Sequence, residues 1–192
     1  MTDNFRKNPG DEEQYKFDPI VHAVTVNSHA ERLVHDGMLF HASGKVTGMV
    51  DTNVDDFLIS VPAGVTPHIL SFSISTGRGD IDIVAYEGTT TSADGTEITE
   101  VFNTNRNSAN VPGTALYSAP TISAVGTLIH TGWMPPTSTG TGQSGGGIVG
   151  ADQGEEWLLQ PSTKYLFRIT NNSGATIAYR WEFMWAEISY EH

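Results

Sequence analysis

The chain has 192 residues, no cysteine, and ten lysines and arginines against 22 aspartates and glutamates, so its formal net charge is −12 at pH 7. This length suits a single domain, with or without arms, and the absence of cysteine excludes disulfides and thiolate metal sites. Phosphate backbones are bound by clustered cations. Because the sequence has no run of lysine and arginine, we expect neither a nucleic-acid partner nor a membrane partner.

The sequence also predicts no export or membrane insertion. No apolar run approaches the roughly 20 residues that cross a bilayer. The N-terminal segment MTDNFRKNPGDEEQYKFDP lacks the apolar stretch of a signal peptide. We therefore expect a soluble protein that is made in the cytoplasm.

Composition predicts an all-β fold, because glycine, serine, threonine and asparagine are abundant and many apolar residues are β-branched or aromatic. Residues 1–20 are polar and show no periodicity, which predicts an extended N-terminal arm that becomes ordered on binding. Residues 21–192 contain about eight to ten short strands separated by turn signals, and no sustained helical pattern. We expect them to form one β-sandwich domain, jelly-roll-like in type, although the strand order stays open at this stage.

The first predicted strands lie between residues 21 and 62. Residues 21–28 alternate, and residues 32–34 are expected as a short strand. His35-Asp36-Gly37 has the composition of a turn. A strand resumes at residues 38–42, and another over residues 55–62 ends at a proline.

A hairpin is predicted over residues 68–88. In HILSFSIST, Leu70, Phe72 and Ile74 alternate with serines, and GRGD follows as a turn before IDIVAYEG. Two alternating segments joined by a short glycine-containing turn are typical of paired antiparallel strands.

The second half of the chain begins with polar residues 89–113. Two strand segments are expected over residues 115–135, followed by a long Gly/Ser/Thr-rich loop over 136–154. Three further strands close the chain, and NNSG is expected to turn the last hairpin.

The final strand carries five large side chains at every second position: Ile177, Tyr179, Trp181, Phe183 and Trp185. Alternate residues of a strand face opposite sides of the sheet. We expect this aromatic side to be one wall of the sandwich core. The side with Arg180 and Glu182 would then face water or a neighbouring subunit.

Several short motifs resemble catalytic sites but lack the context that the chemistry requires. Ser144 in GQSGG matches a serine-hydrolase pattern, yet it lies in a low-complexity loop without the strand and helix that flank a nucleophile. Glu155 and Glu156 are adjacent, so on a strand they point to opposite faces and cannot serve one glycosidic bond. We expect no enzyme activity and no cofactor.

Two groups of residues are candidate metal sites, but ordinary hydrogen bonding explains each group better than metal binding does. The segment DTNVDD offers Asp51, Asp55 and Asp56 to a calcium ion, but the EF-hand glycine and glutamate positions are not matched. Three histidines recur every six residues and would share a face on one continuous strand, although an Asp-Gly turn interrupts it; they are His29, His35 and His41. We expect ordinary hydrogen-bonding roles and no metal.

Three further motifs can be explained by ordinary structural roles. Arg78-Gly79-Asp80 falls at the predicted hairpin turn, where glycine and aspartate are expected in any case. The NNS sequon at Asn171 is expected to be an asparagine-rich turn. Trp133, which precedes a Pro-Pro pair, is a candidate sugar-stacking platform, although such tryptophans more often fill a sandwich edge or an interface.

Most of the chain, from about residue 30 to residue 188, resembles a group of tailed-bacteriophage head proteins that decorate or cement the capsid shell. The resemblance lies in the succession of strand and turn segments and includes no catalytic motif. Its segments are RLVHDGMLFHASGKV, IVAYEGTTTSADGTEI, FNTNRNSAN and EEWLLQPSTKYLFRITNNSGATIAYRWEFMWAE.

The resemblance implies a β-sandwich that forms a homotrimer on the outer surface of the virion and bridges neighbouring major capsid subunits. The residues expected to anchor the arm on the capsid are Phe5, Tyr15, Phe17 and Ile20. Trimer contacts are expected at Asn105, Arg106 and Asn107. Both sets are inferences from residue type, since aromatic residues and arginine are common in interface hot spots.

Two other hypotheses are carried forward. A carbohydrate-binding or fibre-associated phage module predicts an exposed aromatic platform, with Trp133 and Tyr117 as candidates. An enzyme built on Ser144 or on a histidine-bound metal is the least favoured.

Overall fold

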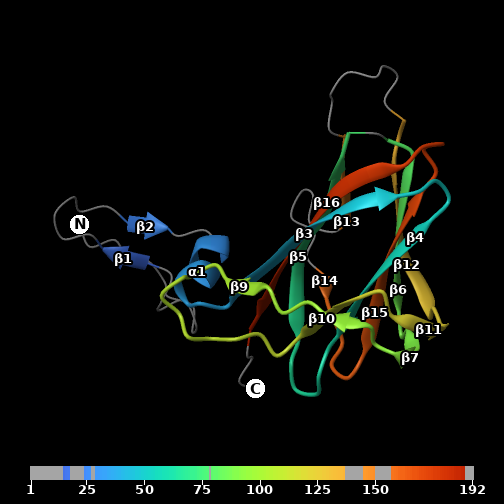
Figure 1. The fold of residues 1–192 in the computed structure, drawn as a ribbon. Helices are drawn as coiled ribbons and strands as arrows, with labels where there is room; N and C mark the ends of the chain where they lie inside the picture. The colour runs from blue at the N-terminus through green and yellow to red at the C-terminus, as the bar shows by residue number, and fades with distance from the viewer. Residues whose placement is uncertain are drawn as a thin grey trace.

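The computed structural model describes residues 15–17, 24–26, 29–77, 79–136, 145–149 and 157–188. Two large antiparallel sheets face each other across a shared core (Figure 1). The predicted all-β sandwich is therefore confirmed. None of the helical residues described here forms a segment long and apolar enough to cross a membrane.

One sheet, here the β16 sheet, has the order β13-β5-β16-β3-β9, and β14 also pairs with β5. Its strands are β13 (Gly145–Val149), β5 (Pro67–Thr76), β16 (Ile177–Glu187), β3 (Leu39–Met49), β9 (Val101–Asn103) and β14 (Trp157–Leu158). The other, the β15 sheet, has the order β12-β6-β15-β4-β10-β8. Its strands are β12 (Thr127–Met134), β6 (Ile81–Glu87), β15 (Lys164–Asn171), β4 (Val54–Ser60), β10 (Ala115–Ser118) and β8 (Thr96–Glu97).

Eight of these strands pair in a nested pattern along the chain. The antiparallel pairs are β6 with β12, β5 with β13, β4 with β15 and β3 with β16. Each pair encloses the one before it in sequence, and successive pairs alternate between the two sheets. One long hairpin rolled up on itself gives this pattern.

The aromatic side of β16 lines the core, as the sequence predicts. Phe183 meets Phe167 of the opposite sheet edge to face at a centroid distance of 5.4 Å, and Trp181 lies 5.0 Å from Phe57. Edge-to-face and tilted contacts of this kind are favoured by the ring quadrupoles. On the other side of the strand, Arg180 is exposed. Alternate residues of β16 therefore face the core and the solvent.

The predicted hairpin over residues 68–88 is wrong, because β5 and β6 lie in different sheets. The NNSG turn likewise joins β15 to β16 across the sandwich and does not close a hairpin. In both places the chain passes from one sheet to the other, so the apolar residues of the two successive strands face the same core from opposite sides. Alternation alone is the same for a strand that pairs with its neighbour and for one that crosses over.

A β-bulge at the start of β5 changes which residues face the core. The register against β16 shifts between Met184 and Trp185, so Ile69 is buried in the main core and Leu70 is not. Leu70 joins a second cluster built around Leu33 and Leu39. The prediction that Leu70 shares a face with Phe72 is therefore wrong.

Residues 32–34, predicted as a strand, belong to helix α1 (His29–His35). Leu33 is buried in the second cluster, which packs against the end of the β16 sheet. The predicted turn follows directly, with Gly37 at φ 67°, in the left-handed region that favours glycine. Burial of Leu33 in tertiary contacts thus stabilises this helix. The helix is too short to show a periodic pattern in the sequence.

The segment between β6 and β12 extends both sheets on the same side of the sandwich. From it β10 pairs with β4, and β9 pairs with β3. The strands β7 (Thr90–Ala93) and β11 (Thr121–Ala124) form a separate two-stranded sheet. The region 115–135 therefore holds three strands where two were predicted.

Two core tyrosines have their hydroxyls fixed by carboxylates. Tyr165 donates to Glu87 at 3.1 Å and accepts from the Gln160 N–H at 2.9 Å, and Tyr179 donates to Asp55 at 2.7 Å. Burial raises the pKa of Tyr165 to about 12, and burial together with the Asp55 carboxylate raises the pKa of Tyr179. Both phenols are thus held in the neutral form in the folded state.

This arrangement predicts loss of stability at alkaline pH. The unfolded chain releases its phenol protons near pH 10, and Tyr165 in the folded chain does so near pH 12, so its contribution is complete below about pH 10 and is lost as pH rises through that interval. We expect the urea midpoint to fall steeply over this range. The Tyr165→Phe variant should show a smaller fall than the parent. Equal slopes for the variant and the parent would contradict the assignment.

Packing of Trp181 against β3 gives a second prediction. Gly44 lies opposite Trp181, and a Cβ at this position would approach the indole Cζ2 to 2.7 Å. Gly44→Ala should therefore lower the free energy of unfolding by about 1–3 kcal/mol, as overpacking does. Gly77→Ala is the matched control, because a Cβ there meets nothing within 4 Å. Denaturant titrations in which the two variants unfold alike would refute this account of Gly44.

Candidate functional site

The residues of the motifs that were weighed as catalytic and rejected do not fall within the part of the chain that the structure describes. Ser144, Glu155 and Glu156 lie outside the described residues, as does Arg78 of the GRGD motif. Asp80 of that motif is described and adopts φ 68°.

The three aspartates proposed for calcium each bind a different part of the fold. Asp51 accepts from the Gly174 N–H at 2.8 Å, Asp55 from Tyr179, and Asp56 pairs with both Nε and an Nη of Arg168 at 2.8 Å. Within the described residues no group of three or more histidines, aspartates and glutamates has the arrangement of a metal site.

The three histidines belong to different elements. His29 and His35 are the first and last residues of α1, whereas His41 lies on β3. The continuous strand that would have aligned them does not form.

The sequon asparagine serves the fold. Asn171 is fully buried, and its Nδ2 donates to the carbonyls of Met49 and Ala175 at 3.0 and 2.8 Å. Its Oδ1 accepts from the N–H and the hydroxyl of Ser173. The predicted asparagine turn is therefore confirmed, and this side chain is not accessible for modification.

The N-terminal residues proposed as capsid anchors are described only in part. Phe5 and Ile20 lie outside the described residues, and Tyr15 and Phe17 belong to β1 (Tyr15–Phe17), which pairs with β2 (Val24–Val26). Figure 1 shows this hairpin beyond α1, apart from the strands of the sandwich. Strand β2, predicted as part of the sandwich domain, pairs with β1 and not with either large sheet.

The tract proposed for trimer contacts is an asparagine-rich loop after β9. The buried Asn103 donates to the Gly37 carbonyl at 2.7 Å and accepts from the Asn105 N–H at 2.9 Å. Asn105 in turn donates to the His35 carbonyl at 3.0 Å and accepts from the Asn107 N–H at 3.1 Å. These bonds fix the loop on the turn between α1 and β3, while the side chains of Arg106 and Asn107 stay exposed.

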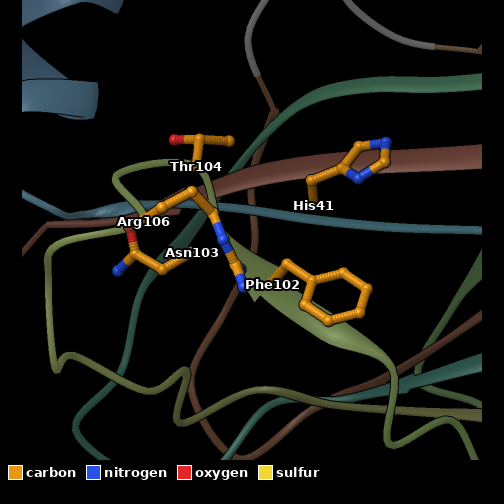
Figure 2. A pocket seen from close by; sticks show the side chains of 5 residues that line it. All are labelled: His41, Phe102, Asn103, Thr104 and Arg106. Atoms are coloured by element: carbon orange, nitrogen blue, oxygen red, sulfur yellow. The ribbon is translucent and has the colours of Figure 1, made fainter.

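An open hollow of about 420 Å³ lies beside this loop (Figure 2). Its residues are His41, Phe102, Asn103, Thr104 and Arg106. Phe102 is 48% exposed, and the Arg106 guanidinium lies 5.2 Å from the centre of its ring, within the range of a cation–π contact. Beside them His41 faces Glu182 at 3.5 Å. The hollow thus offers an aromatic face and a cation from the outer side of the β16 sheet.

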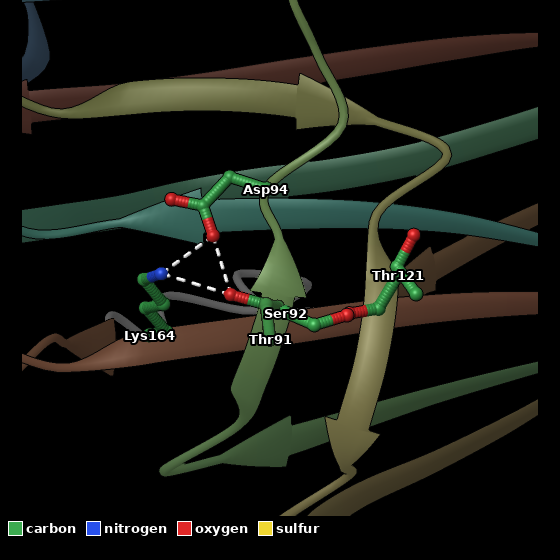
Figure 3. Close-up of polar contacts among 5 residues, drawn as sticks. All are labelled: Thr91, Ser92, Asp94, Thr121 and Lys164. Atoms are coloured by element: carbon green, nitrogen blue, oxygen red, sulfur yellow. Dashed lines mark hydrogen bonds and ion pairs between the residues drawn. The ribbon is translucent and has the colours of Figure 1, made fainter.

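The β7–β11 sheet is held by a polar contact to the β15 sheet (Figure 3). The Lys164 ammonium donates to Asp94 at 2.5 Å and to the Thr91 hydroxyl at 2.9 Å, and Thr91 also donates to Asp94. The hydrogen bond from Lys164 lowers the pKa of Asp94. Each of these three side chains forms a hydrogen bond to the other two, so the cluster anchors the small sheet on β15.

The two aromatic residues that were candidates for a sugar platform lie far apart. Trp133 is on β12 and Tyr117 on β10, four strand steps away in the same sheet, which corresponds to roughly 19 Å. Trp133 is 58% exposed, whereas Tyr117 is half-buried. Any platform therefore belongs to Trp133 alone.

Comparison with known proteins adds no relative. No protein-family model, no curated protein and no solved structure matches the chain. The interpretation of its surfaces therefore depends on their geometry and on the sequence resemblance.

Sequence reasoning missed Phe102 and the residues around Trp133. Phe102 follows Val101 in a three-residue strand, too short to show which residue faces outwards. Asp80 bonds to Trp133, and Asn172 to Asp80, only because turns distant in sequence meet at one end of the β15 sheet. The one sequence signal for Phe102 or Trp133 was an isolated large apolar residue in a polar segment.

The asparagine loop gives a testable prediction about stability. Asn103→Ala leaves the Asn105 N–H without its acceptor and removes one of the two donors to the Gly37 carbonyl, which keeps only Asn110, so we expect it to lower the free energy of unfolding by about 1–3 kcal/mol. Asn107→Ala removes an exposed side chain of the same loop and should change it by less than about 0.5 kcal/mol. Thermal and urea unfolding of both variants provide the measurement, and a neutral Asn103→Ala would contradict this role.

Proposed function

We propose that the protein is a structural component of a bacteriophage virion, which decorates the outer capsid surface and stabilises it by bridging neighbouring major capsid subunits as a homotrimer. The proposal starts from the sequence resemblance to phage head proteins. The observation that carries it is the separate N-terminal hairpin.

The hairpin supports the proposal because the sandwich does not use it. Strands β1 and β2 pair with each other, and neither belongs to a large sheet. A segment that contributes no strand to its own domain is available to a partner. Such segments stabilise a complex when they order on its surface.

The sandwich supplies a rigid base for such an arm. Strands β9 and β10 cover the sheet edges at β3 and β4, which leaves shorter edges for unwanted pairing. The nested pairing of the eight main strands also supports our proposal that the sandwich is of the jelly-roll type.

The proposed protein stabilises the capsid shell by binding to it, without a chemical step. A protein that binds the mature shell and not its precursor stabilises the mature shell by mass action. Three arms on one trimer would bind with avidity, provided that they reach three sites at once. The net charge of −12 favours an outer position, away from packaged nucleic acid.

For contacts between subunits we favour the hollow beside the asparagine loop. Phe102 and Arg106 are exposed there and stacked on each other, and both residue types suit interface centres. The side chain of Asn105 is occupied by bonds to His35 and Asn107, so Arg106 and Asn107 remain the members of the predicted trio with side chains open to a partner.

The test combines a mass measurement with capsid binding. We expect light scattering to give about three times the chain mass of 20.7 kDa, and saturable co-sedimentation with expanded empty capsids built from the major capsid protein of the same phage. The double variant Tyr15→Ser, Phe17→Ser should lose about 30-fold or more in capsid affinity with its mass unchanged.

Lys16→Ser is the matched control from the same strand and should bind as the parent does. Phe102→Ser should lower the mass in solution instead. A monomer that does not bind capsids would refute the proposed function.

A further inference from the structure

Trp133 is the most exposed tryptophan of the protein. It is 58% exposed, whereas Trp181 and Trp185 are buried and Trp157 is half-buried. It lies on β12, the edge strand of the β15 sheet, and its neighbour across the sheet is Asp82. A large aromatic surface left in water forgoes hydrophobic stabilisation, so its position calls for an explanation.

The indole is held in one orientation by Asp80. The Trp133 Nε1–H donates to Asp80 Oδ1 at 3.1 Å. Asp80 itself has φ 68°, a left-handed conformation that is unfavourable for a residue with a side chain. Its N–H donates to the Met134 carbonyl at 2.7 Å, and its carbonyl accepts from the Asn172 N–H at 2.8 Å. Two other segments therefore fix the residue that fixes the indole.

Polar groups line the next strand beside the ring. Asp82 accepts from the Asn172 side chain at 2.8 Å, and the following residue in the same cross-strand row is Thr170. Among the described residues, the second oxygen of each carboxylate has no hydrogen-bond partner of its own. The site thus combines one flat apolar face with carboxylate acceptors, a hydroxyl and an amide, contributed by three separate segments.

We propose that this surface, the Trp133 platform (Asp80, Asp82, Trp133, Thr170 and Asn172), binds a neutral hexose of a cell-surface or secreted glycan. A pyranose ring has an apolar face of C–H groups that packs on an aromatic ring, and hydroxyls at its edge that donate to carboxylates. A preorganised aromatic face and fixed acceptors lower the entropy lost on binding. The two carboxylates repel acidic sugars, which favours neutral ones.

The surroundings favour a small polar ligand over a protein partner. The row that begins at Trp133 continues with Asp82 and Thr170 and reaches an apolar residue only at Val54 on β4. Protein interfaces have a fully desolvated core depleted in charge, and here charged and polar groups separate the two exposed apolar side chains of the row, Trp133 and Val54. The glycan site does not depend on the capsid role.

The first experiment is binding of the full chain to an array of neutral and sialylated or uronic-acid-containing oligosaccharides. Titration of the best neutral oligosaccharide then follows by tryptophan fluorescence, since Trp133 is the tryptophan that solvent and ligand reach most readily. We expect one saturable site per chain and selective binding of neutral sugars. Trp133→Ala should weaken binding by about 30-fold or more, and Trp133→Phe by less.

Two matched variants keep the test specific. Asp80→Asn retains the shape but removes the charge and should weaken binding about tenfold or more. Leu128→Ala removes another exposed apolar residue from the same strand, β12, and should bind the sugar as the parent does. Absence of binding to every neutral sugar, or binding that survives Trp133→Ala, would overturn the site. A Trp133→Ala defect in self-association or capsid binding, with no sugar bound by the parent, would overturn it in favour of a protein interface.

Discussion

Contact between the aromatic side chains of the two sheets is the interaction on which the rest of the structure depends. The rings of Phe167 and Phe183 meet edge to face across the core, and Trp181 packs on Phe57. Because these contacts join residues more than ten positions apart on different sheets, they fix how the sheets face each other. Phe102 and Trp133 lie on strands of these two sheets, so their positions relative to each other depend on that packing.

The two candidate surfaces lie on opposite sheets and have different chemistry. The Phe102–Arg106 hollow belongs to the β16 sheet and offers an aromatic ring with a cation. The Trp133 platform belongs to the β15 sheet and offers an aromatic ring with carboxylates. A subunit contact on the first would leave the second open to solvent, so self-association and glycan binding are compatible on one chain.

The fold uses buried polar side chains to fix its turns and loops. Asn171 closes the turn between β15 and β16, and Asn103 ties the loop after β9 to Gly37. Each amide donates to two backbone carbonyls and accepts from a backbone N–H, whereas a hydroxyl has one donor hydrogen and a carboxylate has none. Where regular pairing ends, these amides take over the hydrogen bonds that the backbone would otherwise lose.

The sequence by itself determined the all-β class, the aromatic side of β16, the turn at Gly37 and the asparagine turn at residue 171, because these depend on alternation and local backbone preference. Only the tertiary structure decided that β5 and β6 lie in different sheets, that Leu70 leaves the core at a bulge, and that residues 32–34 are helical. It also brought Asp80 to Trp133 and Asn172 to Asp80. Strand partners, bulges and such clusters depend on contacts between residues distant in the chain, and an alternating pattern is identical whichever partner its strand meets.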